Sequence, residues 1–367
     1  MKGLLITTKF SGNILDGGEV INKRNYEVLK KSCDKLDVVY VNDKKKLINI
    51  NRKIETLFEI LFFCSFYGIS FKIKEKIRNL LKKNNYDFCW ISSSIGGILA
   101  KFIKKISPKI KVIVFFHNVE FDYFYQLKKT SSSYKYILAL IAKKNEKIAI
   151  KYADKIVALN KRDSKRICEL YGRNVDLIFP TTFNDLYRKN NNIIKRKDEE
   201  KKNLLFVGSN FFANLHGIRW FVRNVLPFLD NVVLYIVGKN TEEWKSEFSN
   251  IDNIKIIGSV PSLEIYYKLA DVVVLPIFLG SGMKTKTAEA LMYGKYIFAT
   301  KEAFEGYDID FFKVGSLCNT REDFINAINY KMLTFPTKYN VYSRNVFEKK
   351  YSTESWIKRI FLFLNEG

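Results

Sequence analysis

The segment Gly280–Gly294 gathers the side chains with the clearest capacity for chemistry in this sequence. Two lysines, Lys284 and Lys286, follow a loop punctuated by glycine, and Glu289 lies three residues after Lys286. Residues three apart on a helix share a face, so Lys286 and Glu289 would point the same way. Backbone N–H groups at the start of such a helix are unpaired and can bind a phosphate, to which the lysines would add positive charge. The segment therefore predicts a phosphate site.

The alternative is an ordinary connection between a strand and a helix. In that case the lysines would be solvated, and Glu289 would only favour the helix through its charge near the positive end of the helix dipole. The spacing alone does not decide between the two interpretations.

A buried strand, a helix and a second strand are expected to position this loop. Asp271–Pro276 is a nearly continuous run of branched apolar residues, typical of a parallel strand covered on both faces. A helix is predicted over Thr285–Tyr293, and Gly294 would end it. The next strand is predicted over Tyr296–Thr300.

The alternation of strands and helices recurs along the whole chain and predicts an α/β fold. The chain has 367 residues, more than one ordinary compact core holds, so two domains are expected. Each would be a Rossmann-like, doubly wound domain with a parallel sheet. The predicted order is an N-terminal domain at 1–185, a polar linker at 186–202, a C-terminal domain at 203–345, and a helix at 346–367 that would pack back on the N-terminal domain.

Two stretches of the N-terminal half fall at predicted carboxyl ends of strands, where doubly wound sheets bind their ligands. Gly17 and Gly18 follow the first strand, and His117, Asn118 and Glu120 follow a strongly apolar strand. These residues are candidate ligand contacts. The alternatives are a histidine that only caps its strand end and a solvated carboxylate in a loop.

The net charge of +24 favours polyanionic partners, which are nucleic acid, an anionic bilayer or phosphorylated substrates. The alternative is compositional, since a proteome rich in Lys and Asn makes many of its proteins basic. The lysines are spread through many predicted helices without a recognition motif, so nucleic acid is the least favoured of these partners.

The use of cysteine and histidine argues against a metal centre. The cysteines stand singly, with no CxxC pair and no Cys/His cluster, and the chain has only two histidines. We therefore expect no zinc site, no other metal or cofactor, and a reducing cytosol as the compartment. The five cysteines are Cys33, Cys64, Cys89, Cys168 and Cys318.

One apolar segment, Leu57–Phe71, has basic residues on both sides. Such a segment can lie in the interface of an anionic membrane, and the alternative is a buried helix of the N-terminal domain. It is shorter than the roughly twenty apolar residues that span a bilayer, and the start of the chain does not have the pattern of a signal peptide. The sequence thus predicts a cytoplasmic protein that binds the inner face of a membrane peripherally.

The second half of the chain resembles the retaining nucleotide-sugar glycosyltransferases of family 4 (glycosyl transferases group 1), which have the GT-B fold of two domains facing a cleft. Its motifs follow the order and spacing of that family's C-terminal domain, and weaker matches extend over the first half. The motifs of the second half are Phe206-Val-Gly208, Ile236-Val-Gly238, Ile257–Val260, Tyr267–Pro276 and Gly280–Gly294, and those of the first half are Gly17-Gly18, Phe116-His-Asn118 and Ala153–Asn160.

The resemblance implies a donor site made mainly by the C-terminal domain. Glu289 matches the glutamate that holds the donor's ribose, and backbone amides around Gly282 and Met283 would face its diphosphate. The loop Ser259–Pro261 matches the loop that contacts the nucleobase. The donor-binding residues implied are Gly17, Gly18, Gly208, Ser209, His216, Ser259, Val260, Pro261, Gly280, Ser281, Gly282, Met283 and Glu289.

Three positions depart from the family's pattern. Ser281 stands where the family has a glutamate that contacts the donor sugar, so sugar recognition must be arranged differently. Ser209 and His216 stand at or near positions where the family often has an arginine and a lysine, and neither is reliably charged at pH 7. We therefore expect Lys284 and Lys286 to supply the cationic role.

The activity implied is the retaining transfer of a sugar from a nucleotide-diphosphate-sugar to a glycan or a polyprenyl-diphosphate-linked acceptor, as in bacterial cell-surface polysaccharide synthesis. The lysines would stabilise the leaving diphosphate, and His117 matches a histidine that faces the donor sugar. Asn118 and Glu120 would contact the acceptor. No side-chain nucleophile and no metal are expected.

Three other functions stay open at the level of sequence. One is a different GT-B enzyme, such as a nucleotide-sugar epimerase, which would need further acid and base side chains. The second is a non-catalytic GT-B-like protein, suggested by Ser281 and Ser209. The third is a basic nucleic-acid-binding protein, suggested only by the net charge.

Overall fold

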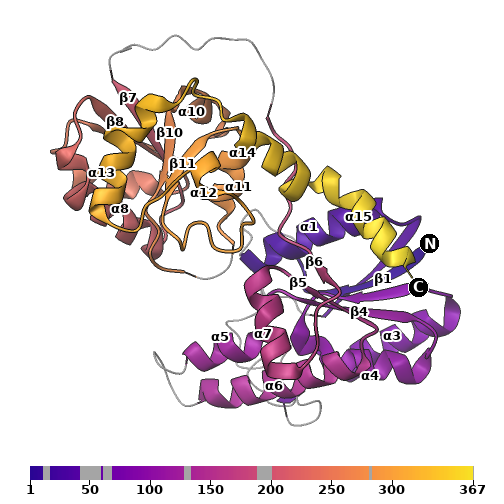
Figure 1. Cartoon of the computed structure of the whole chain (residues 1–367). Coiled ribbons are helices and arrows are strands. Elements are labelled where there is room, and N and C mark those ends of the chain that lie inside the picture. The colour runs from indigo at the N-terminus through magenta and orange to yellow at the C-terminus, as the bar shows by residue number, and fades with distance from the viewer. Residues whose placement is uncertain are drawn as a thin grey trace. The chain divides into compact units, whose positions relative to one another are not determined.

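Two compact units make up the structure, and each contains one parallel sheet. The computed structural model describes residues 1–10, 17–41, 59–60, 68–127, 134–187, 201–280 and 283–366. Unit 1 consists of Met1–Thr182 together with Thr353–Gly367, and unit 2 consists of Phe183–Ser352 (Figure 1). The chain therefore passes between the units twice.

Unit 1 holds a six-stranded sheet in the order β2-β1-β3-β4-β5-β6, with every neighbouring pair parallel. Its central strands form because their residues are apolar without interruption, which suits a sheet covered on both faces. The strands are β1 (Lys2–Thr7), β2 (Lys35–Tyr40), β3 (Phe88–Ile91), β4 (Lys111–Phe116), β5 (Lys155–Ala158) and β6 (Leu177–Ile178). The helices are α1 (Gly17–Lys31), α3 (Phe71–Lys83), the 3-10 turn η2 (Ser94–Gly96), α4 (Gly97–Ile106), α5 (Glu120–Leu127), α6 (Tyr134–Tyr152), α7 (Lys161–Tyr171) and α15 (Thr353–Asn365).

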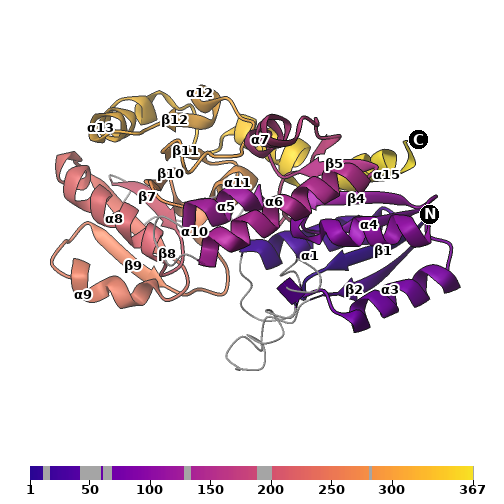
Figure 2. The same ribbon diagram turned by 90° about the horizontal axis from the view of Figure 1, so that it is seen from below.

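Helices cover both faces of the unit 1 sheet. Figure 1 shows α1 and α15 on one side and α3, α4 and α6 on the other, and Figure 2 shows the second group from below. The ring of Trp356 on α15 lies 4.9 Å from the ring of Phe179, which in turn contacts Trp90 of β3. The last helix of the structure thus contributes to the core of the first unit.

Lysines at the start of two strands hold the end of α15. Lys111 donates hydrogen bonds to the carbonyls of Leu364 and Glu366, at 2.9 and 2.6 Å, and Lys155 donates to the carbonyl of Phe363 at 2.8 Å. The last carbonyls of a helix have no partner within the helix and carry partial negative charge, so cations are favourable there.

Unit 2 holds a second six-stranded parallel sheet, in the order β12-β11-β10-β7-β8-β9. Its strands are β7 (Lys202–Val207), β8 (Val232–Val237), β9 (Ile254–Gly258), β10 (Val272–Leu275), β11 (Tyr296–Ala299) and β12 (Gly315–Leu317). The helices are α8 (Phe212–Asn224), η3 (Leu226–Phe228), η4 (Thr241–Trp244), α9 (Lys245–Phe248), α10 (Glu264–Leu269), α11 (Thr285–Met292), α12 (Phe311–Val314), α13 (Arg321–Asn329), η5 (Lys331–Thr334), α14 (Val341–Val346) and the π-helical turn η6 (Phe347–Tyr351).

The two parallel sheets with interleaved helices confirm the predicted fold class. The strand, loop, helix and strand predicted between Asp271 and Thr300 are β10, the following loop, α11 and β11. All four residues of β10 are buried, as its unbroken apolar sequence requires.

The predicted domain boundaries differ from the structure by three residues at the end of the first segment of unit 1, which is Thr182, and by more at the terminal helix. The sequence predicts a terminal helix from residue 346 onward, whereas residues 346–352 belong to unit 2 and α15 begins only at Thr353. The reason is that Phe347 and Tyr351 are buried in the core of unit 2, which holds this turn away from the helix that follows it.

Two predicted features fall largely outside the described residues. Of the linker predicted at 186–202, residues 188–200 are not described, and of the apolar segment Leu57–Phe71 only residues 59–60 and 68–71 are described. Among the described residues, no helix is long and apolar enough to cross a membrane.

Trp356→Ala is expected to destabilise unit 1 by about 3–5 kcal/mol, because a large buried ring is removed from a packed core. Trp356 is 4% exposed, whereas Phe361 on the same helix is 48% exposed. Phe361→Ala is the matched control and should change the free energy of unfolding by less than about 0.5 kcal/mol. Urea unfolding followed by far-ultraviolet circular dichroism measures both, and equal effects of the two substitutions would contradict this packing of α15.

Candidate functional site

The loop between β10 and α11 is held by a direct backbone contact with α8. A Cβ atom at Gly217 of α8 would lie 1.9 Å from the carbonyl oxygen of Pro276, the residue that follows β10, so no side chain fits there. Gly280 has a φ of 131°, a conformation that residues with a side chain rarely adopt. Gly217 lets the chain after β10 pass closely against the first half of α8, and Gly280 lets it turn before α11 begins.

Lys286 is a half-buried cation in the first turn of α11. Its Nζ donates a hydrogen bond to Oδ1 of Asn214 at 2.8 Å, and it lies 5.9 Å from the centre of the Phe206 ring. Burial lowers the pKa of Lys286 to about 8; the charge of Lys284 acts in the same direction and that of Glu289 opposes it. This hydrogen-bond partner is a neutral amide, so the contact does not cancel the charge of Lys286.

Asn214 links Lys286 to the end of strand β7. Its Nδ2 donates to the backbone carbonyl of Ser209 at 2.9 Å, while its Oδ1 accepts from Lys286. The structure thereby brings together the residues predicted after β7 and those predicted in α11. Sequence reasoning missed Asn214, and the local signal for it is a polar side chain on the otherwise apolar buried face of α8.

Lys284 has an acidic partner that the sequence did not reveal. Its Nζ lies 2.6 Å from Oε1 of Glu302, which follows β11, and its carbonyl accepts a hydrogen bond from the hydroxyl of Tyr307 at 2.6 Å. The charge of Lys284 is therefore balanced by Glu302 in this structure. An anion at the loop would compete with Glu302 for Lys284, whereas Lys286 faces no such competition from Asn214.

Glu289 lies half-buried in the middle of α11, beside an aromatic pair. The hydroxyl of Tyr267 donates to Oε2 of Glu289 at 3.3 Å, and the ring of Tyr267 stacks on that of Tyr293 at 4.5 Å. Burial, together with the charge of Glu289, raises the pKa of Tyr267 well above its usual value, so this hydroxyl stays a donor. The carboxylate is thus oriented by a rigid neighbour.

The other predicted donor residues follow the carboxyl ends of neighbouring strands. A Cβ atom at Gly238 would lie 2.0 Å from the carbonyl oxygen of Gly208, so the segments after β7 and β8 touch. After β9, the Ser259 hydroxyl accepts from the N–H of Asn240 at 3.1 Å, and the Ser259 N–H donates to Glu242 at 3.1 Å.

These residues differ in accessibility, and two of them are not described. Ser209, His216, Ser259 and Pro261 are exposed, whereas Gly208, Val260 and Met283 are half-buried. Ser281 and Gly282 lie outside the described residues. Because all six strands are parallel, the described members lie together at the carboxyl-terminal ends of the strands of unit 2. Their roles in binding stay predictions.

The candidates in unit 1 likewise lie at the carboxyl-terminal ends of the strands of their own sheet. His117 and Asn118 are half-buried directly after β4, and the His117 ring meets the ring of Phe115 edge to face at 5.0 Å. Glu120 is the first residue of α5. Gly17 and Gly18 begin α1, the helix that follows β1 in the chain.

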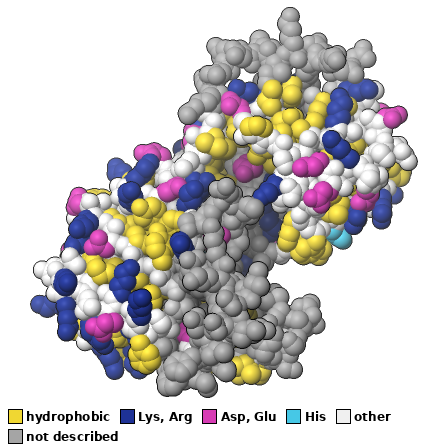
Figure 3. All heavy atoms as spheres, turned by 180° about the vertical axis from the view of Figure 1, so that it is seen from behind, with side chains coloured by type: hydrophobic (Ala, Val, Ile, Leu, Met, Phe, Trp, Pro, Cys, Tyr) yellow, Lys and Arg dark blue, Asp and Glu magenta, His cyan; other side chains and the backbone are white. Residues whose placement is uncertain are grey.

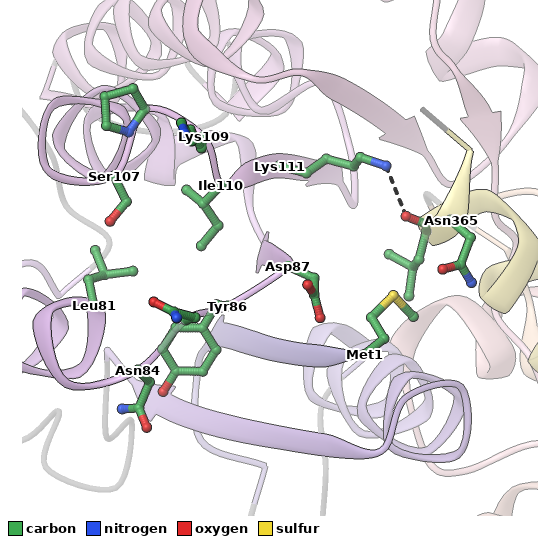
Figure 4. Close-up of a pocket in the computed structure, with 13 residues that line it drawn as sticks. Met1, Leu81, Asn84, Tyr86, Asp87, Ser107, Lys109, Ile110, Lys111 and Asn365 are labelled. Atoms are coloured by element: carbon green, nitrogen blue, oxygen red, sulfur yellow. Dashed lines mark hydrogen bonds between the residues drawn. The ribbon is translucent and has the colours of Figure 1, made fainter.

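One cavity of unit 1 lies at the amino ends of the strands, which is the opposite end of the sheet from these candidates. It has a volume of about 900 Å³ and is lined by the segments that precede β3 and β4 and by the end of α15 (Figure 4). Among the residues in Figure 4 are Tyr86, Asp87, Lys109 and Lys111. Ligands of doubly wound sheets bind beyond the carboxyl ends of strands, so this cavity is not the candidate site.

Charge and metal-binding groups are distributed without a single focus. Figure 3 shows Lys and Arg side chains spread over the visible face and interspersed with acidic and apolar ones. Within the described part of the chain, no group of three or more His, Cys, Asp or Glu side chains could hold a metal ion.

Comparison with known proteins relates unit 2 to one enzyme family. Residues 201–331, which contain all six strands of the unit 2 sheet, match the family model described as glycosyl transferases group 1. No curated protein sequence is significantly similar to the chain.

Several solved structures share the fold of the whole chain. The lipopolysaccharide outer core galactosyltransferase WaaB in its apo form has a TM-score of 0.66 at 16% identity over 99% of each chain. HepE from Anabaena in complex with UDP has a TM-score of 0.67 at 13% identity over 99% of each chain. A glycosyltransferase from Rickettsia africae ESF-5 has a TM-score of 0.63 at 14% identity, over 99% of this chain and 97% of that one. The chain therefore has the GT-B fold, and its residues 201–331 are similar to glycosyl transferases group 1.

Lys286 is expected to give the binding of a nucleoside diphosphate a dependence on pH near 8. Its charged form is present below its pKa of about 8 and is lost above it, so affinity for UDP should fall between about pH 7 and about pH 9. Lys286→Arg should keep its affinity over this range, because a guanidinium stays charged. Isothermal titration calorimetry with UDP checks this, and an equal fall in the Arg variant would assign the effect to another group.

Proposed function

We propose that this protein is a retaining glycosyltransferase of family 4 that takes its sugar from a nucleotide-diphosphate-sugar. The observation that carries the proposal is the part-buried hydrogen bond between Lys286 and Asn214, which lies at the carboxyl ends of the strands of unit 2. This contact lies within the residues that match glycosyl transferases group 1. The neighbouring structure of HepE was determined with UDP, with UDP and glucose, and with UDP-glucose, which favours a UDP-sugar as the donor to test first.

The proposed chemistry needs positive charge where the leaving diphosphate develops negative charge. A cation that is already fixed in a poorly hydrated position stabilises that charge without reorganising, which favours the transition state over the ground state. Lys286 meets this requirement because it is partly buried, burial lowers its pKa, and its hydrogen-bond partner is neutral. Lys284 would assist when the diphosphate displaces Glu302 from it.

The other residues proposed to contact the donor also lie near the carboxyl ends of the strands of unit 2. Glu289, with one oxygen bonded to Tyr267, would hold the ribose hydroxyls, and the backbone around Met283 would contact the diphosphate. Ser259–Pro261 would contact the base. Because Ser281 replaces a glutamate of the family pattern, the donor sugar would be recognised by other groups, among them His117 of unit 1.

The acceptor is proposed to be a glycan or a polyprenyl-diphosphate-linked glycan of a bacterial cell-surface polysaccharide. It would bind at Asn118 and Glu120, which follow the carboxyl end of β4 in unit 1. The net charge of +24 favours a protein that works at the inner face of an anionic membrane without crossing it.

Nucleotide-sugar binding is tested by thermal shift with UDP- and GDP-linked sugars and with free UDP and GDP. A ligand at 100 times its dissociation constant should stabilise the fold by about 2.7 kcal/mol. Lys286→Ala should lose this shift, whereas Lys255→Ala, at an exposed lysine of β9, should keep it. Cooperative melting with no shift for any compound would contradict the proposal and favour a non-catalytic GT-B protein.

Membrane binding is tested by flotation with vesicles of phosphatidylglycerol and phosphatidylcholine. The protein should float with the anionic vesicles at low salt and dissociate as the ionic strength rises, because salt screens surface charge. Vesicles of phosphatidylcholine alone are the control. Failure to float, or flotation that does not depend on salt, would argue against a peripheral membrane enzyme.

A further inference from the structure

Glu146 of α6 is a fully buried carboxylate that receives hydrogen bonds from three other elements of unit 1. It is 0% exposed. Its Oε1 accepts from the hydroxyl of Ser94 in η2 at 3.0 Å and from the backbone N–H of Glu120 in α5 at 2.7 Å. Its Oε2 accepts from the hydroxyl of Tyr171 in α7 at 2.5 Å. The three donors follow β3, β4 and β5 in the chain, so one side chain joins the segments after three adjacent strands.

The preceding residue of α6 fastens the segment after β3 a second time. Oδ1 of Asn145 accepts from the N–H of Ile98 at 3.3 Å, and a Cβ atom at Gly97 would lie 2.0 Å from the Asn145 carbonyl oxygen. Helix α4 thus begins in backbone contact with α6. This close backbone packing holds α6, and with it Glu146, in place against α4.

The hydrogen bond to Glu120 makes Glu146 a cap for α5 supplied from another helix. The first N–H groups of a helix have no partner within it, and a carboxylate there also interacts favourably with the helix dipole. The turn between β4 and α5, which contains His117 and Asn118, is therefore fixed at one end by the sheet and at the other by Glu146.

We infer that Glu146 is a positioning residue that holds the turn between β4 and α5, and with it His117, in place at the carboxyl end of β4. The task of His117 in sugar transfer rests on the proposed function, but the positioning of the turn does not. Burial raises the pKa of Glu146 to about 7, against the lowering effect of the hydrogen bonds donated by Tyr171, Ser94 and the backbone N–H groups of Glu120 and Phe121. If an apolar side chain replaced Glu146, these donors would lose their acceptor at a buried site, which costs free energy.

The test uses the two histidines of the chain as reporters. With histidine labelled by ¹³C at Cε1, the spectrum contains signals from His117 in unit 1 and His216 in unit 2 only, and substitution of either residue assigns them. In Glu146→Ala, the His117 signal should move by more than its line width, while the His216 signal should stay in place. Arg166→Ala is the matched control, because it removes a contact of α7 with Asp122 of α5 without touching the turn.

Glu146→Gln separates hydrogen bonding from charge. Its side-chain carbonyl can still accept from Glu120 and Ser94, and its amide can donate to the hydroxyl of Tyr171, so the His117 signal should remain near its original position. A Glu146→Ala protein that melts cooperatively with an unmoved His117 signal would overturn the inference. If Glu146→Ala does not fold, Tyr171→Phe serves instead: it should move the His117 signal by a smaller amount, and no movement would overturn the inference.

Turnover supplies a second readout once a donor is identified from the thermal-shift panel. Glu146→Ala should lower kcat for release of the nucleotide by about 10- to 100-fold, the effect expected when a contacting group is misplaced by an ångström or less. KM for the donor should change by less than twofold, because the nucleotide binds unit 2. An unchanged kcat with a moved His117 signal would mean that the turn is positioned by Glu146 but that His117 has no part in transfer.

Discussion

Helix α8 and the chain that follows β10 touch through their backbones, and this contact fixes the geometry at the carboxyl ends of the strands in unit 2. With a glycine at position 217, the helix approaches Pro276 more closely than any side chain would allow. Asn214, almost one turn earlier on α8, then reaches both Ser209 and Lys286. The cation, the end of β7 and the start of α11 are therefore held together by one close approach, which dense packing makes rigid.

The fold could be predicted from the sequence because buried strands and helix ends have characteristic local residue patterns. Strand β10 is apolar at every position, and Gly294 ends the following helix with a φ of 60°, a conformation typical of glycine after a helix. The partners of the lysines have no such pattern. Glu302 lies 18 residues after Lys284, and Asn214 lies 72 residues before Lys286, so the order of strands in the sheet decides which side chains meet.

The same reason explains why Glu146 was not anticipated. In sequence it is one charged residue among several in α6, 26 residues after the N–H that it accepts. Each unit thus contains an ionisable side chain withdrawn from solvent near the carboxyl ends of its strands, an acid in unit 1 and a base in unit 2. Both contact neutral donors or acceptors, namely hydroxyl, amide and backbone groups. Burial shifts the pKa of each toward neutrality, because it raises that of Glu146 and lowers that of Lys286.

The assignment of α15 to unit 1 has a consequence for how the chain is made. Unit 2 is contiguous, whereas the core of unit 1 requires residues that are more than 170 positions apart along the chain, Phe179 and Trp356 among them. During synthesis, unit 2 can complete its core as soon as residue 352 has emerged, while the aromatic face of unit 1 waits for the helix that comes after it. Domains that fold on the ribosome usually do so from the N-terminus onward. Here the second unit can finish first, and until then the first unit exposes apolar surface that chaperones recognise.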